Sequence, residues 1–189
     1  MAVTAAGTPY VESSDNVADY PGVSLALANH IDATSGKVLQ VVSVVKTDRF
    51  TTTSGSNVDI TGYSASITPS NASNKILVMS TFNFNNSSAG AYAKLQLLRG
   101  STEIVQGDAA GSSTRVTAGS VIGNNPAAED LENVGFNYLD SPATTSEITY
   151  KWQVKTFSSR TFTFNGTQNT ADANQQNTAS TITLMEISA

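Results

Sequence analysis

From residue 37 onward, apolar and polar residues alternate along short stretches, and turn-forming residues separate these stretches. The clearest case is EITYKWQVKTF, residues 147–157, in which Ile148, Tyr150, Trp152 and Val154 occupy every second position. A period of two is typical of a β-strand with one buried and one solvated face. Because this stretch holds the only tryptophan of the chain, we expect Trp152 to belong to the core rather than to a surface platform for a ligand.

Comparable stretches follow one another to the C-terminus. Val38–Lys46 (VLQVVSVVK) is rich in β-branched residues and is predicted to be a mostly buried strand. Residues 75–85 place Ile76, Val78, Phe82 and Phe84 on one face. Further strands are predicted at 49–53, 58–60, 64–68, 91–99, 102–106, 115–122, 132–139, 161–165 and 178–188, with a tight hairpin turn at 100–101.

This spacing of short strands and turns predicts an all-β fold. We expect an antiparallel two-sheet sandwich of the jelly-roll type, formed by residues 37–189. Residues 1–36 differ, because isolated apolar residues lie there among small polar ones. We expect residues 1–36 to be an N-terminal arm that becomes ordered on a partner, with a short helix at 21–31; a frayed tail is the alternative. The expected anchoring residues are Tyr10, Val11, Tyr20, Pro21, Val23, Leu27 and Ile31.

Two strands carry apolar residues on both faces. In the last strand, Ile182 and Leu184 face one way, and the opposite face also holds apolar side chains. In the 75–85 strand, Leu77 and Met79 likewise place apolar side chains on the second face. A strand with two apolar faces is an aggregation hazard unless something covers it. We expect a second subunit to cover it; a loop of the same chain is the alternative. The expected interface residues are Leu77, Met79, Thr181, Thr183, Met185 and Ile187.

Composition narrows the possible partners and compartments. The chain has 189 residues, enough for one domain and an appendage. Its net charge of −5 without a run of Lys or Arg argues against nucleic acid or an anionic membrane as a partner. The absence of cysteine excludes disulfides and thiolate chemistry. We expect no signal peptide and no membrane insertion, because no apolar run approaches the roughly 18 residues of a membrane span.

Residues for catalysis or for a cofactor are scarce. His30 is the only histidine, so a His-rich metal site is not available. A Ser-His-Asp triad would need this same residue, and no serine lies in a GxSxG motif. The acids Asp108, Glu129, Asp130 and Glu132 lie in or beside predicted loops. They are interpreted as surface residues, with a calcium site at Glu129 and Asp130 as the alternative. We expect no enzyme activity, no cofactor and no metal.

Several stretches resemble a module common in structural proteins of marine and freshwater tailed phages, often labelled tail fibre. The matching pieces are KVLQVVSVVKTDRF, SITPSNASNKILVM, KLQLLRGSTEIVQGDAAGSSTR, FNYLDSPATTSEITYKWQV and STITLMEIS, which together span residues 37–189. The opening YVESSDNVADYPGVSLALANHID is similar to an N-terminal segment of such proteins.

The resemblance implies a trimeric β knob on the virion surface, presented through an N-terminal anchor, without catalytic residues. No shaft repeat separates arm and knob, and an arm of 36 residues reaches at most about 120–130 Å. The resemblance therefore favours a short tail fibre or fibre component involved in host attachment. The alternatives are a capsid decoration protein that stabilises the shell, and a glycan-binding or glycan-degrading module. Expected partners are further copies of the chain and other virion proteins, with a host-surface glycan as a further candidate.

Overall fold

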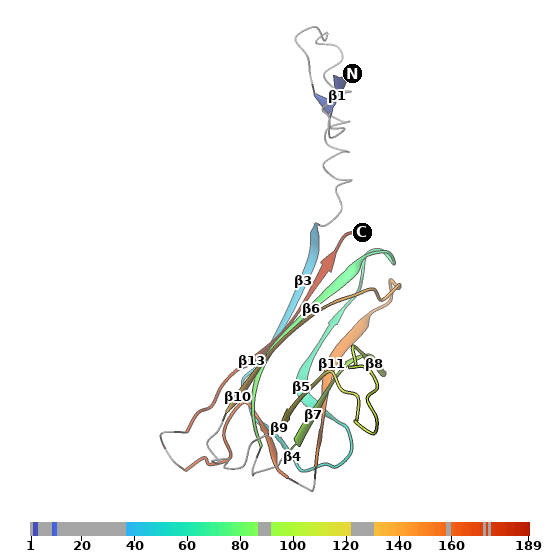
Figure 1. Cartoon of the computed structure of the whole chain (residues 1–189). Helices are drawn as coiled ribbons and strands as arrows, with labels where there is room; N and C mark the ends of the chain where they lie inside the picture. Colours follow the sequence, from blue (N-terminus) through green and yellow to red (C-terminus); the bar gives the residue numbers. More distant parts are fainter. Residues whose placement is uncertain are drawn as a thin grey trace.

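The computed structural model describes residues 37–86, 92–121, 131–157, 160–171, 173 and 175–189. It also describes the backbone of two short strands, β1 (Ala2–Val3) and β2 (Pro9–Tyr10), which pair antiparallel. The predicted helix at 21–31 and the anchoring residues Val11, Tyr20, Pro21, Val23, Leu27 and Ile31 lie outside the described residues, and only the backbone of Tyr10 is described. Within the described part of the chain every regular element is a strand (Figure 1).

The predicted strands are present, most with slightly shorter bounds. They are β3 (Val38–Lys46), β4 (Phe50–Thr52), β5 (Val58–Ile67), β6 (Lys75–Asn86), β7 (Tyr92–Arg99), β8 (Thr102–Ile104), β9 (Ala118–Val121), β10 (Glu132–Asp140), β11 (Ile148–Thr156), β12 (Phe162–Phe164) and β13 (Ser180–Ile187).

These strands form two antiparallel sheets. The first, which we call the β6 sheet, has the order β3-β13-β6-β12-β4, and β10 pairs with the other edge of β6. The short strand β12 pairs with the C-terminal end of β6, beyond the part that pairs with β13, and β4 pairs with β12. The second, which we call the β11 sheet, has the order β5-β11-β7-β8, and β9 also pairs with β7. The two sheets lie face to face (Figure 1).

The order of the strands is that of a jelly roll. The pairs β3·β13, β5·β11, β6·β10 and β7·β9 are all antiparallel. Each pair joins an early strand to a late one, and successive pairs alternate between the two sheets. A long antiparallel ribbon wrapped around a core gives this order. The predicted two-sheet, jelly-roll-like sandwich is therefore confirmed.

The core between the sheets is aromatic and centres on Trp152, whose side chain is fully buried as predicted. Its indole N–H donates to Ser80 Oγ at 3.0 Å, so the one polar atom of the ring is satisfied. The Tyr63 hydroxyl likewise donates to the carbonyl oxygen of Thr181 at 2.7 Å. The rings in contact with these two are Phe82, Phe136 and Phe164, and Phe84 and Phe162 stack on the same cluster.

Two strand predictions were wrong. The separate strands at 58–60 and 64–68 are one strand, β5, whose pairing with β11 shifts register between Lys151 and Gln153. Gly62 lies in this irregular part with a positive φ of 79°, which is why the sequence looked interrupted there.

The prediction that β3 is mostly buried was also wrong. It is an edge strand, paired only with β13, and Val38, Val41 and Val45 are 53%, 55% and 58% exposed. Val42 and Val44 on its other face pack against the core. A β-branched run thus marked a strand correctly, but it did not show how many faces this chain alone would cover.

Candidate functional site

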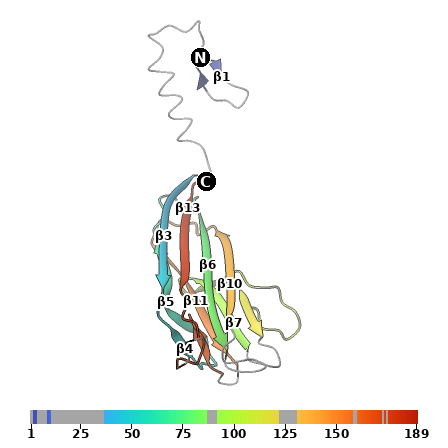
Figure 2. The same ribbon diagram turned by 90° about the vertical axis from the view of Figure 1, so that its left-hand side faces the viewer.

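The outer face of the β6 sheet collects all the residues predicted to form a subunit interface. Figure 2 looks onto this sheet, in which β3, β13, β6 and β10 lie side by side. Ile182 and Leu184 of β13 are buried in the core, so the alternate positions of that strand face outward. The predicted interface residues, which share this outer face, are Leu77, Met79, Thr181, Thr183, Met185 and Ile187.

An apolar row crosses the whole width of this face. Val41, Met185, Leu77 and Leu139 are neighbours in register on β3, β13, β6 and β10. Val41 and Leu139 are 55% and 46% exposed, and Leu77 and Met185 are half-buried. Sequence reasoning missed Val41 and Leu139, because each looks like an ordinary strand residue until register places it beside Met185 or Leu77.

The adjoining rows are polar but nearly uncharged. One row is Ser43, Thr183, Met79 and Asn137, and the next is Val45, Thr181, Thr81 and Gly135. Among the described outward positions of the four paired strands, the only charged residue is Lys75, at the end of β6. A sheet face exposed to water normally carries charges that keep other chains away. Apart from Lys75, the described outward positions of these four strands lack them.

The outer face of the β11 sheet is of the opposite kind. Lys94, Lys151 and Lys155 lie on it at alternate positions of β7 and β11. Lys151 Nζ forms a salt bridge with Asp59 at 2.8 Å, and Gln153 donates to the same carboxylate. The hydrogen bond from Lys151 holds the pKa of the Asp59 carboxyl below its usual value. This face is therefore charged, and one of its three lysines is paired with an acid.

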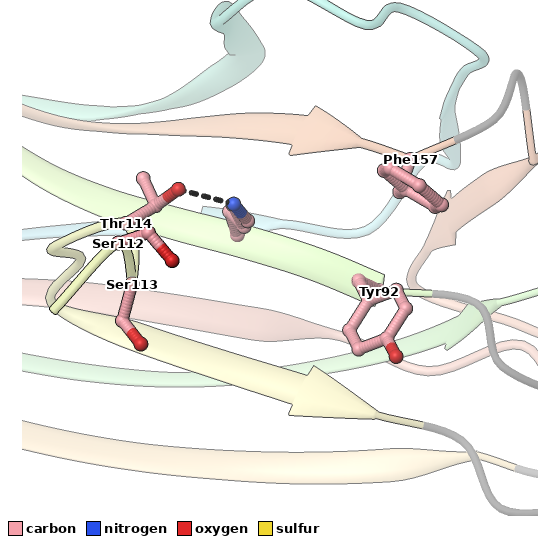
Figure 3. A pocket seen from close by; sticks show the side chains of 6 residues that line it. Tyr92, Ser112, Ser113, Thr114 and Phe157 are labelled. Atoms are coloured by element: carbon pink, nitrogen blue, oxygen red, sulfur yellow. Dashed lines mark hydrogen bonds between the residues drawn. The ribbon is translucent and has the colours of Figure 1, made fainter.

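A pocket of about 480 Å³ opens on the β11 sheet side (Figure 3). Its lining residues are Tyr92, Lys94, Ser112, Ser113, Thr114 and Phe157. The Tyr92 and Phe157 rings meet edge to face, with centroids 5.6 Å apart and an interplanar angle of 88°. Lys94 Nζ donates to Thr114 Oγ1 at 2.5 Å. Sequence reasoning missed this pocket; its one signal was that Phe157 continues the outward positions of the 147–157 strand.

Two buried polar clusters lie at the end of the sandwich where β6 begins, since Asp140 and Glu186 both pair with Ile76. At one, Arg99 Nη1 donates to both carboxylate oxygens of Asp140, at 3.0 and 2.9 Å, and the Tyr150 hydroxyl donates to Asp140 Oδ2 at 2.6 Å. Burial and the bond to Asp140 raise the pKa of the Tyr150 hydroxyl, so it stays protonated. The cluster links β10 of one sheet to β7 and β11 of the other. Because the carboxylate is fully engaged, we interpret it as structural.

The second cluster surrounds Glu186 of β13, which is 1% exposed. Glu186 Oε1 accepts from the backbone N–H and the hydroxyl of Ser70 and from Asn74 Nδ2, each at 2.7 Å. Burial alone would raise the pKa of this carboxyl, but the hydrogen bonds from Asn74 and Ser70 outweigh burial and lower the pKa. This network fixes the loop before β6 to the last strand.

Among the described residues, no three His, Cys, Asp or Glu side chains come together as metal ligands. His30, Glu129 and Asp130 lie outside the described residues, so the calcium alternative stays open. The part of the chain that the structure describes contains no helix of the length and hydropathy needed to cross a membrane.

No family model matches the chain. No curated protein matches it either. Among solved structures, the chain is similar to one described as the structure of infectious bursal disease virus Gx strain, with 14% identity and a TM-score of 0.42 over 79% of this chain and 37% of that one. It is also similar to the VP2 subviral particle of infectious bursal disease virus, with 14% identity and a TM-score of 0.39 over 79% of this chain and 38% of that one.

The chain spans less than two fifths of the length of these two proteins. Likeness at this level carries no information on function. The described sandwich has two outer faces of different chemistry: a nearly uncharged, partly apolar face on the β6 sheet, and a charged face with an aromatic pocket on the β11 sheet.

Proposed function

We propose that the protein is a non-enzymatic virion structural protein, a homotrimeric β-sandwich knob on the virion surface that is held by its N-terminal arm. Within this class we favour a short tail fibre or fibre component involved in host attachment. The support is the resemblance of residues 37–189 to phage tail-fibre-type modules, together with the outer face of the β6 sheet.

The observation that carries the proposal is the contrast between the two outer faces. Protein interfaces are depleted of charged residues at their centre and enriched in apolar ones. The row of Val41, Met185, Leu77 and Leu139, with a single lysine at its margin, has this composition. An apolar band across a whole sheet is costly to leave in water. Burial against further copies of the chain removes that cost.

The position of this row favours copies of the same chain as its cover. The row lies near the end of the sandwich where residues 1–36 join it, since Lys37 and Ser188 exchange hydrogen bonds there. Subunits packed through this face would have the starts of their β3 strands close together at one end of the assembly (Figure 1). Their arms could then bind one anchoring point on the particle.

The residues proposed to dock the arm on other virion proteins are Tyr10, Val11, Tyr20, Pro21, Val23, Leu27 and Ile31. A capsid decoration protein would use the same knob, the same subunit interface and the same arm. The two roles differ only in whether the arm binds the tail or the shell.

The position and copy number of the protein on intact particles test this proposal. Gold-labelled antibodies against the knob are expected to mark a few sites at one vertex, as a tail protein requires. Labels spread over the whole shell would favour the decoration role. Purified particles that contain none of the protein would overturn both.

A glycan-binding role is the second candidate, and the pocket at Tyr92 and Phe157 favours it. Hydrolysis of a glycosidic bond needs a pair of carboxyl groups beside the bond. None of the six described lining residues is an acid. The pocket therefore supports binding of a glycan rather than its degradation.

A further inference from the structure

We propose that the Tyr92–Phe157 pocket binds an acidic sugar residue, a pyranose ring that carries a carboxylate. This inference deepens the host-attachment part of the proposed function by naming the ligand chemistry. It draws on the β11 sheet alone and does not depend on how the β6 sheet assembles. Three features in and beside the pocket point to this ligand. They are exposed aromatic rings, the lysines Lys94 and Lys155 without a described acid as partner, and a row of hydroxyl groups.

The aromatic pair forms an exposed apolar surface at the pocket. Tyr92 and Phe157 are 41% and 57% exposed, although both are large rings at the ends of well-formed strands. They stand nearly perpendicular to each other, so each presents a surface at the pocket (Figure 3). A ligand with one apolar ring face can pack on such a surface and remove it from water. The C–H face of a pyranose ring has this shape.

The lysines supply a positive charge that no described acid neutralises. Lys94 of β7 and Lys155 of β11 are directly opposite each other in register. Like charges at such a position repel and destabilise the sheet. Among the described residues no acid lies within salt-bridge distance of either ammonium group, whereas Lys151 on the same face is neutralised by Asp59. A bound carboxylate would relieve the repulsion.

The hydroxyl groups match the rest of a sugar. Ser112, Ser113 and Thr114 line the side of the pocket away from the aromatic rings (Figure 3). The turn that carries them is closed by a hydrogen bond of 3.0 Å from Ser113 N to Ala110 O. Lys94 uses one of its three N–H donors on Thr114, so two remain for a ligand. Hydroxyls and an ammonium group can bond to ring hydroxyls and a carboxylate at once.

A nucleic acid would also combine negative charge with ring faces, but the pocket does not favour it. Single-stranded nucleic acids are bound along a positively charged groove that follows the backbone. Here a single lysine, Lys94, lines a pocket of about 480 Å³, with Lys155 opposite it in register, on a chain with a net charge of −5. That volume suits a small ligand rather than a strand.

Methyl glucuronide and methyl glucoside test the proposal, because they differ mainly in the carboxylate. Binding to the full-length protein is measured by ligand-observed nuclear magnetic resonance. We expect saturable binding of the glucuronide about tenfold tighter than that of the glucoside, as a charge-assisted contact predicts. The preference should shrink as salt is added.

Variants locate the binding. Lys94→Gln and Lys155→Gln are each expected to reduce the preference for the glucuronide, and Phe157→Ala to weaken both sugars about tenfold. Lys151→Gln is the matched control on the same face and should leave binding unchanged, because Lys151 already pairs with Asp59. A thermal melt of each variant reports whether it is still folded.

Equal affinity for both sugars, or a glucuronide preference that survives both lysine changes, would overturn the assignment. So would binding of an oligo-dT strand that the same variants abolish while neither sugar binds. Light scattering on the same samples reports the oligomeric state. A failed sugar titration on a trimer would refute only this inference, and a sugar-binding monomer would refute only the assembly proposed above.

Discussion

At the residue scale, the interior of the sandwich combines an aromatic core with polar atoms that have specific partners. The indole N–H of Trp152 reaches Ser80, and the hydroxyl of Tyr63 reaches a backbone carbonyl of the last strand. Both bonds run from one sheet to the other. They therefore fix how the sheets sit on each other, while the rings fill the centre of the core.

Replacement of Trp152 by Ala should lower the free energy of unfolding by about 3–5 kcal/mol, because it removes a fully buried aromatic ring and leaves a cavity. Urea denaturation followed by circular dichroism measures the change. Phe157→Ala is the control, since that ring is 57% exposed and should cost far less. A Trp152→Ala variant as stable as the parent would contradict the central place of this residue in the core.

Glu186 should make stability depend on pH. The pKa of its carboxyl is lower in the folded chain than its ordinary value of 4.5, so the unfolded chain binds a proton first on acidification. The contribution of Glu186 is therefore present above about pH 4.5 and is lost as the pH falls through the lower pKa of the folded chain.

Urea denaturation at neutral pH and below pH 4 tests this on the parent and on Glu186→Gln. The variant should be less stable at neutral pH and should lose less stability on acidification. The exposed carboxyls of Asp48 and Asp59 also have lowered pKa values, but they contribute equally to both proteins. Identical acid dependence in parent and variant would exclude this role of Glu186.

At the scale of elements, the sequence predicted strands well and exposure less well. Period-two patterns located β6, β11 and β13, because each has large apolar residues at alternate positions that the core covers. The same logic failed for β3, whose β-branched residues occupy both faces while its partners cover only one. A local sequence pattern shows which residues lie on each face of a strand. The position of the strand in the sheet determines which of these residues are buried.

The candidate sites show the same limit. The face of β13 could be predicted from its own residues, since Met185 and Ile187 alternate with the core residues Ile182 and Leu184. The pocket could not, because it joins the end of β11 and the start of β7 to the 112–114 turn. No sequence pattern spans three separate segments, and only the fold brings them together.

The N-terminal arm is an element with a function of its own in this account. Deletion of residues 1–36 should give a soluble oligomer with an unchanged sandwich that no longer joins particles, because both sheets of the sandwich and its core lie from β3 onward. Circular dichroism and a particle-binding assay measure the two properties. Replacement of Tyr20, Val23 and Leu27 together by Ser should reproduce the loss of binding. Aggregation of the truncated chain, or continued attachment to particles, would contradict the division at residue 36.

At the scale of the whole molecule, the sandwich presents two unlike surfaces. The β11 sheet carries lysines, an acid and a pocket, as a surface in contact with solvent and ligands does. The β6 sheet carries an apolar row with almost no charge across four strands. A knob that packs through the second face would point the first face outward, where a host-surface ligand could reach it.

The oligomeric state of the purified full-length protein tests this account most directly. Light scattering at micromolar concentration should give the mass of three chains. Replacement of both Met185 and Ile187 by Asp should give single folded chains, because it would bury unpaired charge in the interface. Thr149→Asp, on the outer face of β11, is the control and should remain a trimer. A parent protein that is a stable monomer, or a double variant that stays trimeric, would contradict the assignment of the β6 sheet as the subunit interface.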